Sequence, residues 1–186
     1  MKINKENPWK TLSQKPVYEP WISLTEYEVS SPGGGKDIYG KVSFKNLTIG
    51  ITPLDENNNT RLVGQYRYTL NEYSWEIPMG GGPLVINALK SAKRELKEET
   101  GITATEWGKI LKIHASNSVT DEVGYVFLAR NLSFGKPQSV QSESDLKIKK
   151  TSFKNVLRMA EREELTDSLS LSRILRLPTD LISDIS

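Results

Sequence analysis

Cysteine is absent from this chain of 186 residues, and histidine occurs only once, as His114. Without cysteine the protein has no disulfide framework and no thiolate chemistry, which is compatible with a reducing cytoplasm. A zinc centre built from cysteine and histidine is disfavoured for the same reason. His114 stands at the end of an expected strand, and we interpret it as a structural side chain rather than a catalytic one.

Long apolar segments are lacking too. No stretch approaches the roughly 18 apolar residues of a membrane-spanning helix, and residues 1–8 contain no apolar segment of the kind found in signal peptides. We therefore expect a cytoplasmic protein with no membrane partner.

An excess of charge of one sign is also missing. The chain has 25 basic and 23 acidic residues, a net charge of +2, and the basic residues are spread along its length. Nucleic-acid binding requires a basic patch or stripe, so no nucleic-acid partner is expected. The densest basic run, residues 147–150, alternates as an exposed strand edge does.

The patterns that are present predict an α/β or α+β sandwich. Strand-like segments cover 17–30, 36–51 and 61–68, with a turn over 32–35. A helix is expected over 88–100, capped by Asn87 and ended by Gly101. Further strands are expected over 107–114, 123–130 and 145–150. Two last helices, over 153–162 and 167–176, would be capped by Ser152 and Thr166.

The expected helix over 88–100 carries the strongest functional signal. Glu98 and Glu99 follow Glu95 by three and four residues, so the three carboxylates project from neighbouring points of one helical face. Two like charges about 4 Å apart repel by roughly 4 kcal/mol at an effective dielectric of 20, so burying the cluster requires a cation. Oxygen ligands favour Mg²⁺ or Mn²⁺.

A glycine run, Gly80-Gly81-Gly82, precedes this helix, and we read it as a loop whose residues can adopt positive φ and approach phosphate closely. Thirteen residues separate Gly80 from the segment Arg94–Ile102, which reads RELKEETGI. This spacing and sequence resemble the Nudix box, the diphosphate-hydrolysing motif of the Nudix hydrolase family. One position departs from it: Ile86 stands where the family usually has a glutamate.

The resemblance extends over nearly the whole chain, to the ADP-ribose pyrophosphatase and nucleoside-diphosphate-sugar hydrolase branch of the family. It implies an α/β/α sandwich around a mixed sheet, with a β-rich N-terminal extension over 1–45, a Nudix domain over 46–186, and a homodimer that uses the extension. The segments that carry it are Trp9-Lys10, Ile38–Gly40, Gln65–Arg67, Trp75–Gly80, Ser116–Glu122 and Glu164–Asp167.

The resemblance also implies an activity, the metal-dependent hydrolysis of a nucleoside diphosphate sugar to a nucleoside monophosphate and a sugar phosphate. ADP-ribose is the favoured substrate. Two alternatives stay open. One is action on GDP-mannose or another nucleotide sugar, because the motif specifies the diphosphate and the metal only. The other is a low-activity nucleotide-binding module, which the isoleucine at position 86 makes worth considering.

Site residues follow from the same pattern. Glu95, Glu98 and Glu99 would bind the metal, with the backbone carbonyl of Met79 completing the set. Arg94 would hold a ligand carboxylate by a charge-assisted hydrogen bond, or form only a surface ion pair with Glu98. The expected substrate contacts are Arg67, Glu76, Gly80 and Gly81.

The general base is expected in a loop after the Nudix helix. The two candidates are Glu143 and Glu122, and we rank Glu143 first with Glu122 as a possible auxiliary acid. Trp75 and Tyr66 are more simply explained as core residues than as surfaces for a nucleotide base.

Overall fold

The computed structural model describes residues 6–138 and 145–176, and these form two compact units. The N-terminal unit contains the described residues up to Lys45 together with the loop Ser116–Glu122. The second unit contains the described residues of 46–115 and of 123 onward. None of the described helices combines the length and the apolar character needed to cross a membrane.

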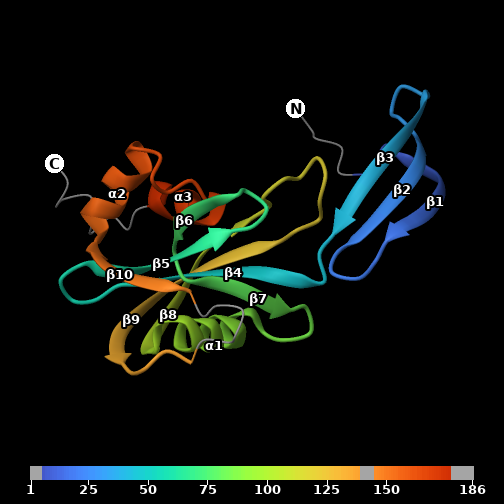
Figure 1. The fold of residues 1–186 in the computed structure, drawn as a ribbon. Helices are drawn as coiled ribbons and strands as arrows, with labels where there is room; N and C mark the ends of the chain where they lie inside the picture. The colour runs from blue at the N-terminus through green and yellow to red at the C-terminus, as the bar shows by residue number, and fades with distance from the viewer. Residues whose placement is uncertain (1–5, 139–144, 177–186) are drawn as a thin grey trace. The chain divides into compact units, whose positions relative to one another are not determined.

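The N-terminal unit is an antiparallel sheet in the order β1-β2-β3 (Figure 1). Its strands are β1 (Lys10–Tyr18), β2 (Ser23–Ser30) and β3 (Lys36–Ser43). The turn between β2 and β3 uses Gly34 at φ +86°. Loop 116–122 is attached to β3, where Lys41 forms an ion pair of 2.9 Å with Asp121. Val29 is the one apolar side chain buried among the described residues of this unit, so the sheet has little core of its own.

The second unit is built around a mixed sheet in the order β7-β4-β9-β8. Strands β4 and β9 pair in parallel, whereas β4–β7 and β8–β9 pair antiparallel. An antiparallel sheet, β10-β5-β6, belongs to the same unit. The strands of the two sheets are β4 (Asn46–Pro53), β5 (Asn59–Arg67), β6 (Glu72–Glu76), β7 (Met79–Pro83), β8 (Ile102–Ile113), β9 (Gly124–Phe134) and β10 (Lys147–Ser152).

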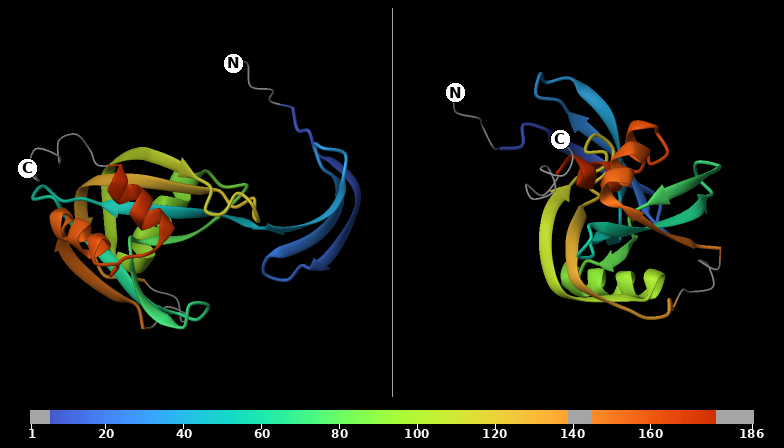
Figure 2. Two further views of the ribbon diagram at one scale, coloured as in Figure 1. Left: turned by 90° about the horizontal axis from the view of Figure 1, so that it is seen from above. Right: turned by 90° about the vertical axis from the view of Figure 1, so that its left-hand side faces the viewer.

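Helices cover the strands of the second unit from two sides (Figures 1 and 2). Helix α1 (Ala88–Thr100) lies on one side, and α2 (Phe153–Glu161) and α3 (Ser168–Leu175) lie on the other. Each side has its own apolar cluster: Ala92 and Leu96 of α1 pack with Ile49 and Ile51 of β4. The cluster on the other side contains Leu62, Ile77, Val126, Val156, Met159, Leu165, Leu169 and Ile174. The predicted α/β/α sandwich around a mixed sheet is confirmed.

Local signals predicted three helix boundaries correctly and one incorrectly. The side chain of Asn87 accepts a hydrogen bond from Leu89 N at 2.9 Å, and Gly101 ends α1 at φ +71°. Ser152 caps α2 as expected. For α3 the cap is Asp167, not Thr166, because the Asp167 carboxylate accepts from the backbone N–H of the first helical turn.

The reading of the glycine run as a loop was wrong. Residues 79–83 form strand β7, which pairs with β4 over five residues from Asn46 to Gly50. Positive φ does not occur at Gly80, Gly81 or Gly82. Glycine is needed in this strand for close packing and not for an unusual backbone conformation.

Candidate active site

Helix α1 places two acidic side chains against the edge strand β7. Glu95 and Glu99, one turn apart, are only 6% and 2% exposed. Ser91, one turn before Glu95, is also buried and lies beneath Gly82. The helix therefore packs its Ser91, Glu95 and Glu99 face onto the glycine strand instead of presenting these acids to solvent.

The close contact depends on the missing side chain of Gly80. A Cβ atom at residue 80 would overlap the carboxylate of Glu95. A Cβ at Gly82 would reach 3.0 Å from Ser91 Oγ, whereas one at Gly81 would have only ordinary contacts, at 3.7 Å or more, with Asn46. Strand β7 thus carries glycine where the buried carboxylate needs the space.

Arg94 links three acceptors at this site. Its Nη2 donates to the carbonyl oxygen of Gly81 at 2.8 Å and to Glu95 Oε1 at 2.5 Å, while Nη1 donates to Glu98 Oε2 at 2.8 Å. Arg94 thus bonds Glu95, one of the predicted metal ligands, and also Glu98, the partner in the alternative interpretation. The cation compensates part of the negative charge and fixes Glu95 relative to β7.

Glu99 is held by the strand itself. The backbone N–H of Met79 donates to Glu99 Oε2 at 3.0 Å, so Glu99 lies at the residue whose carbonyl was expected to bind metal. The Glu98 side chain is 32% exposed and bonded to Arg94, which sets it apart from the two buried acids.

The oxygen atoms that this site offers are of the type that a hard divalent cation prefers as ligands. Glu95 and Glu99 supply carboxylate oxygens from one buried helical face, next to the backbone of Met79 and Gly80. Oxygen-only sets of this type suit Mg²⁺ or Mn²⁺. Within residues 6–138 and 145–176 no three His, Cys, Asp or Glu side chains are grouped as a ready metal cage, so further ligands would come from backbone, water or substrate.

Strands β5 and β6 bring two of the predicted substrate contacts together. Arg67 Nε donates to Glu76 Oε1 at 2.9 Å, and Arg67 Nη2 donates to Glu76 Oε2, which makes a bidentate pair. Glu76 is buried, but the Arg67 side chain is 35% exposed. The bond to Glu76 raises the pKa of Arg67 despite partial burial, and the charges of Asp167 and Glu99 add to the effect. Arg67 is therefore a fixed cation facing the acids of the site.

Sequence reasoning missed the contribution of helix α3. The hydroxyl of Ser170, fully buried, accepts a hydrogen bond from Ile77 N at 3.0 Å and donates to Asp167 Oδ2 at 2.9 Å. Burial raises the pKa of Asp167, and the nearby charge of Glu76 raises it further. A serine in the first turn of a helix normally indicates only capping, so no sequence signal pointed to this link.

The remaining candidates are placed as follows. Glu143 lies outside the described residues. Glu122 belongs to the loop that groups with the N-terminal unit. Both stay predictions as general base. His114 directly follows β8 and is exposed, and Ile86 is 43% exposed in the turn between β7 and α1.

The two aromatic residues near the site differ from each other. Trp75 packs against the apolar cluster on the α2 and α3 side, as expected for a core residue. Tyr66 is 52% exposed, and its hydroxyl donates to Asn71 Oδ1 at 2.7 Å, so the core interpretation was wrong for Tyr66. It lies on the exposed β5–β6 hairpin instead.

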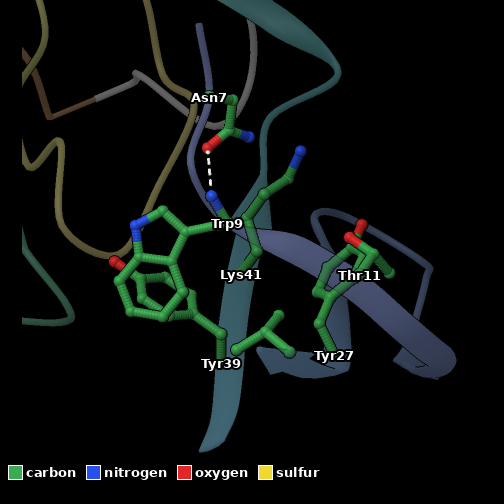
Figure 3. Close-up of a pocket in the computed structure, with 7 residues that line it drawn as sticks. Asn7, Trp9, Thr11, Tyr27, Tyr39 and Lys41 are labelled. Atoms are coloured by element: carbon green, nitrogen blue, oxygen red, sulfur yellow. Dashed lines mark hydrogen bonds between the residues drawn. The ribbon is translucent and has the colours of Figure 1, made fainter. Parts of the chain in front are cut away.

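The N-terminal unit contains a separate open pocket of about 410 Å³ (Figure 3). The indole of Trp9 packs edge-on against the ring of Tyr39, with centroids 5.9 Å apart. Tyr27 and Lys41 complete the main part of the lining. Three aromatic residues of the extension, Trp9, Tyr27 and Tyr39, thus line one pocket of its sheet.

Comparison with known proteins gives a consistent result. The chain is 28% identical over 177 residues to an ADP-ribose pyrophosphatase of Mycobacterium tuberculosis, covering 91% of this chain and 83% of that protein. It is 27% identical over 166 residues to an ADP-ribose pyrophosphatase of Bacillus subtilis, covering 86% of each. Its fold is similar to a crystal structure of an ADP compounds hydrolase, with a TM-score of 0.82, 16% identity and 98% of both chains covered. No protein-family model matches.

These similarities agree with the site that the structure contains. The box of residues 80–102 folds into the glycine strand and the acidic helix, and the two sequence relatives align with nearly the whole chain. In sequence, in fold and in the arrangement of these residues, the chain is similar to Nudix pyrophosphatases.

Proposed function

We propose that the protein hydrolyses the diphosphate bond of a nucleoside diphosphate sugar, with ADP-ribose as the favoured substrate. The products would be a nucleoside monophosphate and a sugar phosphate. The observation that carries the proposal is the burial of Glu95 and Glu99 against Met79 and Gly80, with Arg94 and Arg67 as neighbouring cations. The names of the two relatives favour ADP-ribose among nucleotide sugars.

The chemistry requires charge compensation, because the oxygens of a diphosphate repel an attacking water. Mg²⁺ or Mn²⁺ held by Glu95 and Glu99, with Glu98 and the Met79 carbonyl as further ligands, would offset that charge. Arg94 holds Glu95 in place. The partly exposed guanidinium of Arg67, oriented by Glu76, can bind a phosphate oxygen in the fork geometry that arginine offers.

Hydrolysis then consists of attack by water on one phosphorus and cleavage of its bond to the bridging oxygen. The proton lost by the water would pass to a general base, for which Glu143 and then Glu122 are the candidates. The bridging oxygen would leave on the second phosphate. The backbone of Gly80 and Gly81 can approach the phosphates closely, because neither residue has a side chain.

The same site is compatible with two alternative functions. GDP-mannose or another nucleotide sugar would use the same diphosphate contacts. A low-activity binding module is the second alternative, since Ile86 supplies no charge. The presence of Glu95, Glu98 and Glu99, two of which are bonded to Arg94, favours turnover over binding alone.

We also propose a homodimer to which residues 1–45 contribute much of the contact. A three-stranded sheet that buries a single apolar side chain among residues 6–45 needs an additional surface to pack against. A cytoplasmic location stays a prediction.

The substrate proposal is tested by measuring phosphate release from a panel of nucleotide sugars. Each reaction contains Mg²⁺ or Mn²⁺ and is coupled to a phosphatase that acts on the products but not on intact diphosphates. We expect ADP-ribose to give the highest kcat/KM. Equal or higher values for GDP-mannose would replace the favoured substrate, and no release from any substrate would support the binding module.

A further inference from the structure

The segment between β6 and β7 connects two parts of the site, the Arg67–Glu76 pair and the Met79–Glu99 hydrogen bond. It begins after Glu76, which orients Arg67, and ends at Met79, which bonds Glu99. Only Ile77 and Pro78 lie between, and proline has no backbone N–H. The N–H of Ile77 is therefore the one backbone donor available to fix this connection from within.

That donor is used by helix α3. Ile77 N donates to Ser170 Oγ at 3.0 Å, across 93 positions of sequence. Neither residue is accessible to water, since Ile77 is 2% and Ser170 0% exposed, so water cannot replace the bond. The carbonyl oxygen of Pro78 accepts from Ile51 N of β4 at 2.8 Å, which holds the other side of the connection.

Ser170 is itself oriented. Its hydroxyl and its backbone N–H both donate to Asp167 Oδ2, at 2.9 and 2.8 Å. With its proton committed to Asp167, the hydroxyl presents a lone pair to Ile77 N. Asp167 is the cap of α3, so the orientation of the hydroxyl is tied to the start of this helix.

We propose that Ser170, oriented by Asp167, is a positioning residue for the metal and phosphate site. Its bond to Ile77 fixes the connection so that the Met79 backbone meets Glu99 while Glu76 holds Arg67. This inference rests on the proposed function, because it assigns Ser170 a role in the same site. The role requires no contact between Ser170 and substrate.

The test combines amide exchange with metal binding, using the whole protein. In Ser170→Ala the amide of Ile77 loses its acceptor, and we expect its hydrogen exchange to accelerate about 10-fold or more relative to the amide of Ile51. Affinity for Mn²⁺, measured by titration with electron paramagnetic resonance and without substrate, should weaken about 10-fold. Unchanged exchange of Ile77 or unchanged Mn²⁺ affinity overturns the proposal.

Two controls separate positioning from general stability. Ile174→Val removes one buried methyl from the same helix without touching the hydrogen bonds, and should change neither readout. If it weakens Mn²⁺ binding as much as Ser170→Ala, the role of Ser170 is only structural and the proposal fails. Asp167→Asn keeps one oxygen that can accept both bonds from Ser170, so slow exchange at Ile77 should survive. Fast exchange in this variant contradicts the assigned orientation.

The inference and the function on which it rests fail in different ways. A wild-type protein that binds no Mn²⁺ overturns the metal site and this inference together. A wild-type protein that binds Mn²⁺ and hydrolyses nucleotide sugars, with a Ser170→Ala variant that binds the ion equally well, overturns the inference alone.

Discussion

Gly80 and Glu95 lie so close that any side chain at residue 80 would occupy the space of the Glu95 carboxylate. The contact joins the edge strand β7 to helix α1 and makes the glycine a condition for burying the acid. The neighbouring Gly81 is different, because a Cβ there would meet only Asn46 atoms at 3.7–3.8 Å.

This difference predicts a large effect for one alanine substitution and a small effect for the other. Gly80→Ala should displace the Glu95 carboxylate and lower kcat/KM about 100-fold, since a shift of about 1 Å in a catalytic group can cost that much. Gly81→Ala should leave kcat close to wild type and affect only KM, because its φ is ordinary and a Cβ there does not reach the Glu95 carboxylate. Steady-state kinetics with ADP-ribose test this prediction. Equal losses of kcat in the two variants would contradict the proposed role of the Gly80 contact.

Ile86 can be changed back to the acid that the family motif usually carries. Ile86→Glu should leave kcat unchanged or raise it, and should lower the metal concentration for half-maximal rate, because a negative charge is added near the acidic cluster. Val85→Glu, at a side chain that is 95% exposed, is the matched control and should change neither value. Hydrolysis that occurs only in Ile86→Glu would favour the binding-module alternative for the wild type.

The dimer prediction concerns the aromatic residues of the extension. Trp21 is 78% exposed, and Trp21→Ser should weaken self-association if these aromatics form the contact. Tyr68→Ser, at a side chain of the second unit that is 92% exposed, should not. Analytical ultracentrifugation at about 20 μM suits an interface of standard size. A wild-type monomer at that concentration would refute the proposed dimer.

Acid should weaken the fold through Asp55 in the turn before β5. Burial raises the pKa of this carboxyl, but the backbone and side-chain N–H groups of Asn59, the N–H of Asn57 and the charge of Lys150 together lower it below its ordinary value of 3.8. Because the folded-state pKa is the lower one, the stabilisation is complete above the unfolded pKa and is lost as pH falls through the folded value.

We therefore expect Asp55→Asn to cost about 1 kcal/mol of unfolding free energy at neutral pH and progressively less below about pH 4. Urea unfolding of both proteins from pH 7 to pH 2.5 measures this difference. Glu56→Gln, at the exposed neighbouring residue, serves as the control. A cost for Asp55→Asn that does not shrink in acid would show that the charge of Asp55 is not what stabilises the turn.

The features that sequence predicted well are those fixed by neighbouring residues. The limits of α1 follow from the cap at Asn87 and the left-handed Gly101, which need no tertiary information. The spacing of Glu95 and Glu99 likewise fixed their common face. The confirmed sandwich follows from the alternation of strand and helix patterns.

The features that were missed depend on pairing between distant segments. Three glycines carry no side-chain pattern, so nothing local shows that they form a strand paired with β4. Arg67 and Glu76 were each selected, but their bond follows from the register of β5 and β6. The Ser170 bond to Ile77 spans 93 positions, and only the packing of α3 on the core creates it.

The most direct test of the account is the metal dependence of Glu99→Gln. The amide oxygen of glutamine can still accept the Met79 N–H, so the variant should fold with a Tm close to wild type while losing one ligand charge. We expect kcat for ADP-ribose to fall about 10²–10³-fold at saturating Mg²⁺. Glu161→Gln, at the exposed end of α2, should retain full activity. A Glu99→Gln enzyme that hydrolyses nucleotide sugars at the wild-type rate across all metal concentrations would contradict the assignment of the site.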